Sequence, residues 1–197
     1  MERVADFIFR YLADQGAETV FVLTGNGSMH MNDAIVKEPR LKYVCARNEA
    51  AAPVMASAYS RVSNRIGVVS VTSGPGATNA VAGLAEAWVD SSPVIIISGQ
   101  SPTAELPSAG EGRPVRTFGT AGVDIVSVVR PLTKYAKTIS DPKMVRKELE
   151  CAVFEATSGR PGPVWLDIPM DVQSAEIDPS KLEGFSILAT RSTQISF

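Results

Sequence analysis

Short apolar runs alternate with amphipathic stretches along most of the chain. Five runs are rich in β-branched or aromatic residues and apolar at successive positions, which is typical of strands that helices cover on both faces. These runs are residues 20–23, 43–45, 67–71, 94–97 and 164–168. A weaker, alternating pattern at residues 134–138 predicts a further strand at an edge of the sheet.

Between the runs, apolar residues recur three or four positions apart, which predicts helices. The predicted helices are residues 4–15, 28–37, 48–62, 77–90 and 141–157. Gly16 follows the first helix, and Asp141 with Pro142 is typical of a helix start. Trp88 in the fourth helix and Trp165 in the last strand lie at core-facing positions, so both are predicted to pack inside.

The alternation of strand and helix predicts an α/β fold. Parallel strands are joined by right-handed helical crossovers, which place helices on both faces of the sheet. We therefore expect a three-layer αβα domain with a central, mostly parallel sheet of about six strands.

Two segments interrupt this alternation. Residues 101–119 contain several glycines and prolines and predict a long loop, which in a compact domain is more often functional than not. From Asp171 onward the periodicity fades into a polar stretch. We therefore expect one domain over residues 1–175 and a linker or C-terminal tail over residues 176–197.

Composition and charge narrow the function classes. The 45% apolar share and 20% charged share exclude a disordered or fibrous chain. A formal net charge of −2 gives no general attraction to nucleic acid or to an anionic membrane, so neither is expected as a partner. No apolar run reaches the roughly 20 residues that cross a bilayer. Acidic Glu2 and Asp6 near the start are atypical of a signal peptide.

The cysteines and the single histidine offer little catalytic chemistry of their own. Cys45 and Cys151 form neither a metal-binding spacing nor a disulfide framework, which favours a reducing, cytoplasmic location. His30 has no partner at a recognisable spacing and is interpreted as a helix-surface or cleft-lining residue. We expect no metal site on this chain.

Glycine-bearing turns follow three of the predicted strands, at residues 24–28, 72–79 and 99–100. Ligands of open α/β sheets collect at the carboxyl ends of the strands, and glycines there allow the backbone to approach a ligand closely. The first turn lacks the third glycine of a dinucleotide-binding fingerprint, and neither of the first two carries the lysine of a phosphate loop. Taken alone, each turn is equally consistent with a plain strand–helix connection.

Glu49 is the candidate catalytic carboxylate. It follows the second predicted strand and starts the third predicted helix. One interpretation is purely structural, because Asn48 suits a helix N-cap and an acidic residue suits the first turn. The other is a partly buried carboxylate that faces the glycine turns and is available for proton transfer. The local pattern leaves both open.

Several motifs stand together in one order and spacing. They are Asn48–Ala52 with Ala58–Arg61, then Ser73–Asn79, then Asp90–Pro93 leading into Ile97–Gln100, and finally Arg160–Val164 with Asp167–Pro169. Together they resemble the N-terminal pyrimidine-binding domain of thiamine-diphosphate enzymes, in the group of acetolactate synthase, pyruvate oxidase and benzoylformate decarboxylase. The resemblance covers residues 1 to 175 and implies the thiamine-diphosphate-binding fold.

The resemblance also implies roles for particular residues. Glu49 would bond a ring nitrogen of the aminopyrimidine and so activate the cofactor toward a 2-oxo acid, for decarboxylation or carboligation. The residues implied to line the pyrimidine pocket are Glu49, Thr72, Pro75 and Asn79. Those implied to lie near the thiazolium and the substrate are Gly25, Asn26 and Gly27.

Other features of the family are missing from these 197 residues. No Gly-Asp-Gly occurs, so we expect Mg²⁺ and the diphosphate on a partner domain or subunit, and little catalysis by this chain alone. Ala121-Gly122 and Met170 replace the Gln-Glu and lysine common in acetolactate synthases, which argues against branched-chain amino-acid synthesis.

Two further expectations concern partners. The alanine- and glycine-rich helices near residues 48 and 77 predict a homodimer interface, because small residues permit close helix approach. The alternative function is a non-catalytic interaction or regulatory module that retains the fold.

Overall fold

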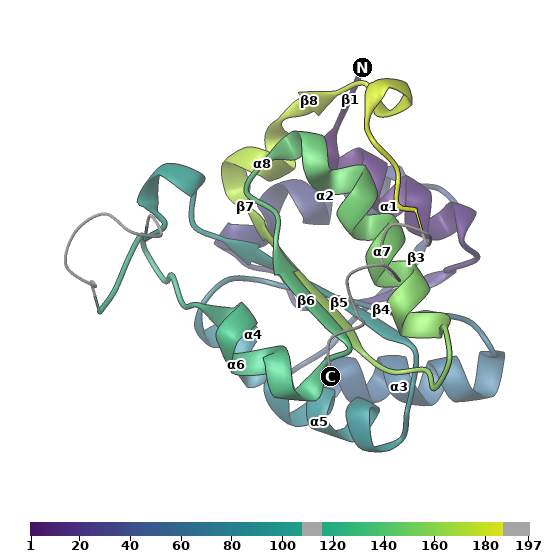
Figure 1. The fold of residues 1–197 in the computed structure, drawn as a ribbon. Helices are drawn as coiled ribbons and strands as arrows, with labels where there is room; N and C mark the ends of the chain where they lie inside the picture. Colours follow the sequence, from purple (N-terminus) through teal and green to yellow (C-terminus); the bar gives the residue numbers. More distant parts are fainter. Residues whose placement is uncertain (108–115, 187–197) are drawn as a thin grey trace, which may run out of the picture.

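A computed structural model of the chain describes residues 1–107 and 116–186 (Figure 1). Its centre is a sheet of six strands in the order β3-β2-β4-β5-β7-β6, and every neighbouring pair is parallel. The strands are β2 (Thr19–Val22), β3 (Lys42–Cys45), β4 (Gly67–Val71), β5 (Val94–Gln100), β6 (Tyr135–Thr138) and β7 (Val164–Pro169). The predicted parallel sheet is confirmed, including β6 at its edge.

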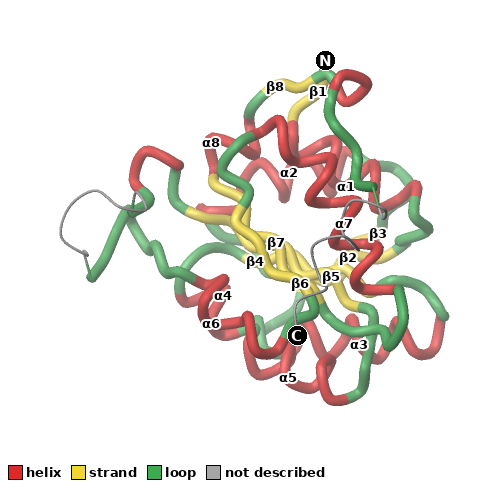
Figure 2. The backbone as a smooth tube through the Cα atoms, in the orientation of Figure 1, coloured by secondary structure: helices red, strands yellow, loops and turns green. Residues whose placement is uncertain are grey.

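Helices cover both faces of this sheet, as Figures 1 and 2 show. One face carries α1 (Val4–Asp14), α2 (Met29–Lys37), α7 (Val145–Thr157) and α8 (Met170–Ser174). The other carries α3 (Ala51–Ser63), α4 (Pro75–Asn79), α5 (Val81–Val89) and α6 (Ile125–Val129). Short 3₁₀ turns are η1 (Asn26–Ser28), η2 (Thr103–Glu105), η3 (Arg130–Leu132), η4 (Pro142–Met144) and η5 (Pro179–Lys181). The three-layer αβα architecture is confirmed.

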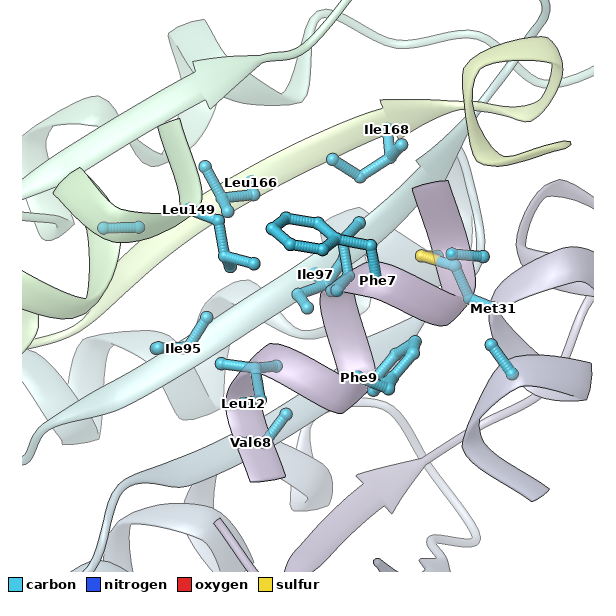
Figure 3. Close-up of a cluster of buried hydrophobic side chains, with 14 of the residues drawn as sticks. Phe7, Phe9, Leu12, Met31, Val68, Ile95, Ile97, Leu149, Leu166 and Ile168 are labelled. Atoms are coloured by element: carbon cyan, nitrogen blue, oxygen red, sulfur yellow. The ribbon is translucent and has the colours of Figure 1, made fainter. Parts of the chain in front are cut away.

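Two apolar clusters hold the layers together. Between the sheet and α1, α2 and α7, the buried side chains include Phe9, Leu12 and Leu149 (Figure 3). On the opposite face the cluster includes several alanines of α3 and α5, and the fully buried Trp165. The alanines let these helices pack close to the sheet, and the predicted interior position of Trp165 is confirmed.

Two predictions about burial are wrong. All four residues of β3 are exposed, because β3 is an edge strand with a neighbour on one side only. Trp88 is 40% exposed, since the helix predicted over residues 77–90 breaks at Ala80 into α4 and α5 and Trp88 lies in the last turn of α5.

The helix α6 is absent from the sequence prediction. Its residues Ile125–Val129 are mostly β-branched, a composition typical of strands. The signal that starts it is polar: the Asp124 carboxylate accepts hydrogen bonds from the Ser127 backbone N–H and hydroxyl. The predicted loop 101–119 contains η2, and its residues 108–115 lie outside the described part of the chain.

The segment after residue 175 packs on the domain over the residues described. Strand β8 (Glu176–Ile177) pairs antiparallel with β1 (Glu2–Arg3), and Ile177 is buried. Further on, the Phe185 backbone N–H donates to Glu150 Oε2 at 2.6 Å, and the Phe185 ring lies 5.4 Å from that of Phe154. Residues 187–197 of the predicted linker or tail lie outside the described residues, and the boundary at residue 175 stays a prediction.

Candidate functional site

The turns that follow β2, β3 and β4 lie together at the carboxyl ends of these strands. These three strands are neighbours and run parallel, so their carboxyl ends lie at the same side. This arrangement brings the turn after β2, the Glu49 turn after β3 and the loop after β4 together.

Glu49 lies in the turn between β3 and α3 and is half-buried. Helix α3 begins at Ala51, three residues later than the predicted start. Asn48 caps the preceding turn, where its Oδ1 accepts from the Ala50 N–H at 2.8 Å, and the Glu49 carbonyl accepts from the Ala52 N–H at 3.2 Å. The backbone around Glu49 is therefore fixed, while its carboxylate extends toward the loop after β4.

The Glu49 carboxylate has one hydrogen-bond partner within the described residues. Asn79, the last residue of α4, donates its side-chain N–H to Glu49 Oε2 at 3.2 Å. The other oxygen, Oε1, accepts no hydrogen bond from residues 1–107 or 116–186. The carboxylate is thus held by one amide and keeps an oxygen free to accept a further donor.

Thr72 packs the turns after β2 and β4 against each other. Its Oγ1 accepts from the Gly27 N–H at 3.0 Å. A Cβ placed at Gly25 would lie 2.5 Å from the Thr72 Cβ, and one at Gly76 would lie 2.5 Å from its Cγ2. The Gly76 Cβ would also lie 3.4 Å from Glu49 Oε1, so the absence of a side chain at Gly76 allows Thr72 to pack close to the carboxylate.

Among the described residues, Asn26 forms no hydrogen bond with Glu49 or Thr72, and it lines a separate cavity. This cavity has a volume of about 90 Å³, and its other walls include Gly27, Ser73, Gln100, Thr120 and Met170. Pro75 is the first residue of α4 and is exposed. The structure therefore places Glu49, Thr72, Asn79, Gly25 and Gly27 together, and it places Asn26 in the adjoining cavity.

A buried polar network escaped the sequence analysis. Asp167 in β7 is 1% exposed, and its carboxylate contacts Ser98 and Gln100 of β5. Burial raises the pKa of Asp167 to about 7, against hydrogen bonds from Ser98, Gln100 and Thr138 that lower it. The available signal was a carboxylate inside the apolar run 164–168, which is a costly residue at a buried position unless it has partners.

The two cysteines are further candidate nucleophiles in the sequence. Cys45 is exposed and Cys151 is half-buried, and neither is in a disulfide. Burial raises the pKa of the Cys151 thiol to about 11, which disfavours the reactive thiolate. Residues 1–107 and 116–186 hold no cluster of three or more His, Cys, Asp or Glu suited to a metal ion, and no helix long and apolar enough to cross a membrane.

The comparisons with known proteins agree with the fold. Residues 2–128 match the family described as "Thiamine pyrophosphate enzyme, N-terminal TPP binding domain". The chain is 39% identical over 169 residues to "Acetolactate synthase, chloroplastic" of Arabidopsis thaliana, which covers 86% of this chain and 24% of that protein. It is 36% identical over 168 residues to "Acetolactate synthase isozyme 3 large subunit" of Escherichia coli, covering 85% and 28%.

An archaeal relative, "Probable acetolactate synthase large subunit" of Methanocaldococcus jannaschii, is 36% identical over 177 residues, or 90% of this chain and 28% of that protein. The chain therefore spans about a quarter of the length of the curated relatives it matches. The family match over residues 2–128 covers more than half of the chain. The chain therefore belongs to the thiamine pyrophosphate enzymes, as their N-terminal TPP-binding domain.

Proposed function

We propose that residues 1–175 bind the aminopyrimidine end of thiamine diphosphate, with Glu49 as the catalytic carboxylate. The observation that carries this proposal is the half-buried Glu49 side chain, which accepts from Asn79 at Oε2 and has no protein donor at Oε1 within the described residues. A flat nitrogen heterocycle can donate a hydrogen bond to that oxygen. Thr72, Pro75 and Asn79 complete the proposed cofactor contacts.

When bound, the cofactor supplies an electron sink for decarboxylation (a lyase reaction) or carboligation (a transferase reaction) of a 2-oxo acid. Glu49 would share a proton between its Oε1 and the ring nitrogen. Asn79 would keep the carboxylate oriented, and Gly25, Asn26 and Gly27 would border the substrate. The names of the relatives, acetolactate synthases, support the carboligation of 2-oxo acids.

The departures from acetolactate synthases bear on the substrate. Met170, at the position where those enzymes commonly carry lysine, lines the cavity of about 90 Å³ beside Asn26 and Gly27. The cavity wall therefore carries the apolar side chain of Met170, whereas a lysine there would favour an anionic group of the substrate. We therefore propose a reaction outside branched-chain amino-acid synthesis.

We propose that Mg²⁺ and the diphosphate are held by a diphosphate-binding domain or subunit outside these residues. The absence of a Gly-Asp-Gly sequence supports this, as does the lack of a carboxylate cluster suited to a metal among residues 1–107 and 116–186. The chain alone, given cofactor and Mg²⁺, should then show negligible decarboxylation. Measurable decarboxylation of a 2-oxo acid by the purified chain refutes that expectation.

We further propose that the protein is a cytoplasmic homodimer. The unpaired Cys45 and Cys151 support a reducing location. The exposed stripe of α3, formed by Ala51, Val54 and Ala58, supports a close contact with a second copy.

The test mixes the chain with thiamine diphosphate, Mg²⁺ and a separately supplied diphosphate-binding domain, and compares wild type with Glu49→Gln. Calorimetry measures cofactor binding, and decarboxylation of a 2-oxo acid measures activity. Exposed Glu18 provides the matched control, Glu18→Gln. Activity of the reconstituted enzyme should fall about 10²- to 10⁴-fold for Glu49→Gln and stay unchanged for Glu18→Gln. Equal activity in all three proteins removes Glu49 from its role. Absence of any cofactor binding favours the interaction module instead.

A further inference from the structure

Asp167 is the acceptor at the centre of a buried hydrogen-bond network. Its Oδ1 accepts from the Ser98 hydroxyl at 2.6 Å. Its Oδ2 accepts from Gln100 Nε2 at 3.0 Å and from the Thr138 hydroxyl at 3.3 Å. These donors come from the two strands that flank β7, so one carboxylate joins three strands near their carboxyl ends.

Each side chain in this network has a defined role as hydrogen-bond donor or acceptor. Trp165 Nε1 donates to Ser98 Oγ at 2.8 Å, and Ser98 in turn donates to Asp167. Gln100 donates from Nε2 both to Asp167 and to the Val123 carbonyl at 2.9 Å, while its Oε1 accepts from the Ser101 N–H at 3.0 Å. Both ends of the Gln100 amide are therefore occupied, and the amide cannot flip without losing these bonds.

The Val123 carbonyl belongs to a segment that borders the cavity beside Gly27. Within segment 118–124, the Gly122 N–H donates to the Phe118 carbonyl at 2.9 Å and closes a tight turn. Thr120, at the tip of this turn, lines the same cavity as Gln100 and Gly27. The Ile125 N–H donates to the Val123 carbonyl at 2.8 Å, so Val123 also anchors the start of α6.

We propose that Asp167 is a positioning residue that orients the Gln100 amide, which in turn holds Val123 and keeps segment 118–124 against the cavity next to Gly27. A buried carboxylate is costly unless donors satisfy it, and here three donors do so inside an otherwise apolar strand. Any effect of Asp167 on catalysis rests on the proposed function. The positioning of segment 118–124 depends only on residues of this chain.

The first variant is Asp167→Asn. An asparagine offers one acceptor and one donor group, so its NH₂ would face either the Ser98 hydroxyl or the Gln100 NH₂. The matched control is Thr138→Val, which removes a donor to the same carboxylate but leaves the path from Asp167 through Gln100 to Val123 intact.

The readout is amide hydrogen exchange of the full chain, followed by NMR without any cofactor. Exchange at Gly122 and Ile125 reports on segment 118–124, and exchange at Val69 and Ile96 in the central strands reports on global unfolding. For Asp167→Asn we expect exchange at Gly122 and Ile125 to accelerate at least tenfold more than at Val69 and Ile96. For Thr138→Val all four amides should change by a similar factor.

The double variant Asp167→Asn with Gln100→Glu separates positioning from general stabilisation. The introduced glutamate can accept from the NH₂ of the introduced asparagine and still accept from the Ser101 N–H, but it has no donor for the Val123 carbonyl. We expect protection at Val69 and Ile96 to recover while Gly122 and Ile125 remain fast.

Two results overturn the proposal. One is a uniform effect of Asp167→Asn on all four amides, which is the signature of a merely structural residue. The other is recovery of Gly122 and Ile125 in the double variant. Because no cofactor is present, a failure of the proposed thiamine diphosphate site leaves these outcomes unaffected.

Discussion

The side-chain amide of Asn79 donates a 3.2 Å hydrogen bond to the carboxylate of Glu49. The bond joins the end of α4 to the turn before α3, two segments that follow different strands of the sheet. It leaves the second carboxylate oxygen without a partner in the described part of the chain.

Replacing Asn79 with alanine should weaken cofactor binding, because the Glu49 carboxylate loses the donor that orients it. A hydrogen bond to a charged group contributes about 1.5–3 kcal/mol, so the dissociation constant for thiamine diphosphate should rise by about one to two powers of ten. Calorimetry of the reconstituted protein measures this. Asn64, at the C-terminal end of α3, supplies the control variant Asn64→Gly. An unchanged dissociation constant for Asn79→Ala contradicts the prediction.

Gly76→Ala should displace Thr72 from its position beside Glu49. The added Cβ would lie 2.5 Å from Thr72 Cγ2 and 3.4 Å from Glu49 Oε1, so Thr72 must shift. We expect about 1–3 kcal/mol lower unfolding free energy in urea and a loss of cofactor binding. Gly162→Ala is the control, since its Cβ would meet only the flexible side chain of Lys134. Full cofactor affinity in Gly76→Ala counts against the assigned pocket.

Leu12→Ala should test the core between α1 and the sheet. Leu12 is fully buried in the cluster of Figure 3, and truncation leaves a cavity that costs about 2–5 kcal/mol of unfolding free energy. Urea denaturation followed by circular dichroism measures the change. Val62→Ala, at a side chain that is 90% exposed, should change the free energy by less than about 0.5 kcal/mol. Equal effects of the two variants would disprove this packing.

Asp167 should make stability fall as pH rises. Burial raises its pKa from 3.8 to about 7, with the Asp124 charge acting in the same direction. Between these values the folded state binds more protons than the unfolded state, so unfolding free energy decreases with pH, by at most about 4 kcal/mol, and levels off above pH 7. Urea titrations of wild type and Asp167→Asn from pH 4 to 8 isolate this contribution. A difference between the two that is constant across the range is the contrary result.

The proposed homodimer should depend on the exposed stripe of α3. Ala58→Arg places a long cation in a contact of small side chains and should shift the protein to monomer in light scattering. Val36→Arg, at an exposed site of α2 on the opposite face of the sheet, should leave the mass unchanged. A wild-type protein that is monomeric at high concentration contradicts the dimer itself.

Sequence periodicity was sufficient for the sheet and most helices, because strand and helix repeats depend on nearby residues. It failed where burial depends on strand order. The apolar residues of β3 predict a covered strand, yet β3 lies at an edge, and no local pattern records which strand has one neighbour. Helix α6 was missed because its start depends on the Asp124 side chain rather than on helix propensity.

The candidate site likewise has one part that the sequence predicts and one part that it does not. The convergence of the turns after β2 and β4 with Glu49 follows from the parallel-sheet rule and was predictable. The Asp167 network was not, because Asp167 finds Ser98 and Gln100 at separations of 69 and 67 residues. Spacing along the chain carries no signal for such a contact, whereas the isolated carboxylate in a buried strand does.

The antiparallel pairing of Glu2 and Arg3 with Ile177 and Glu176 brings the two ends of segment 2–177 side by side. In a variant limited to this segment, a short engineered bridge could join the two strands, and new ends could then be opened at a surface loop elsewhere. Such a circular permutant should keep all six central strands in register. Rearranging the order of the chain in this way would leave Glu49 and Asn79 facing each other as before.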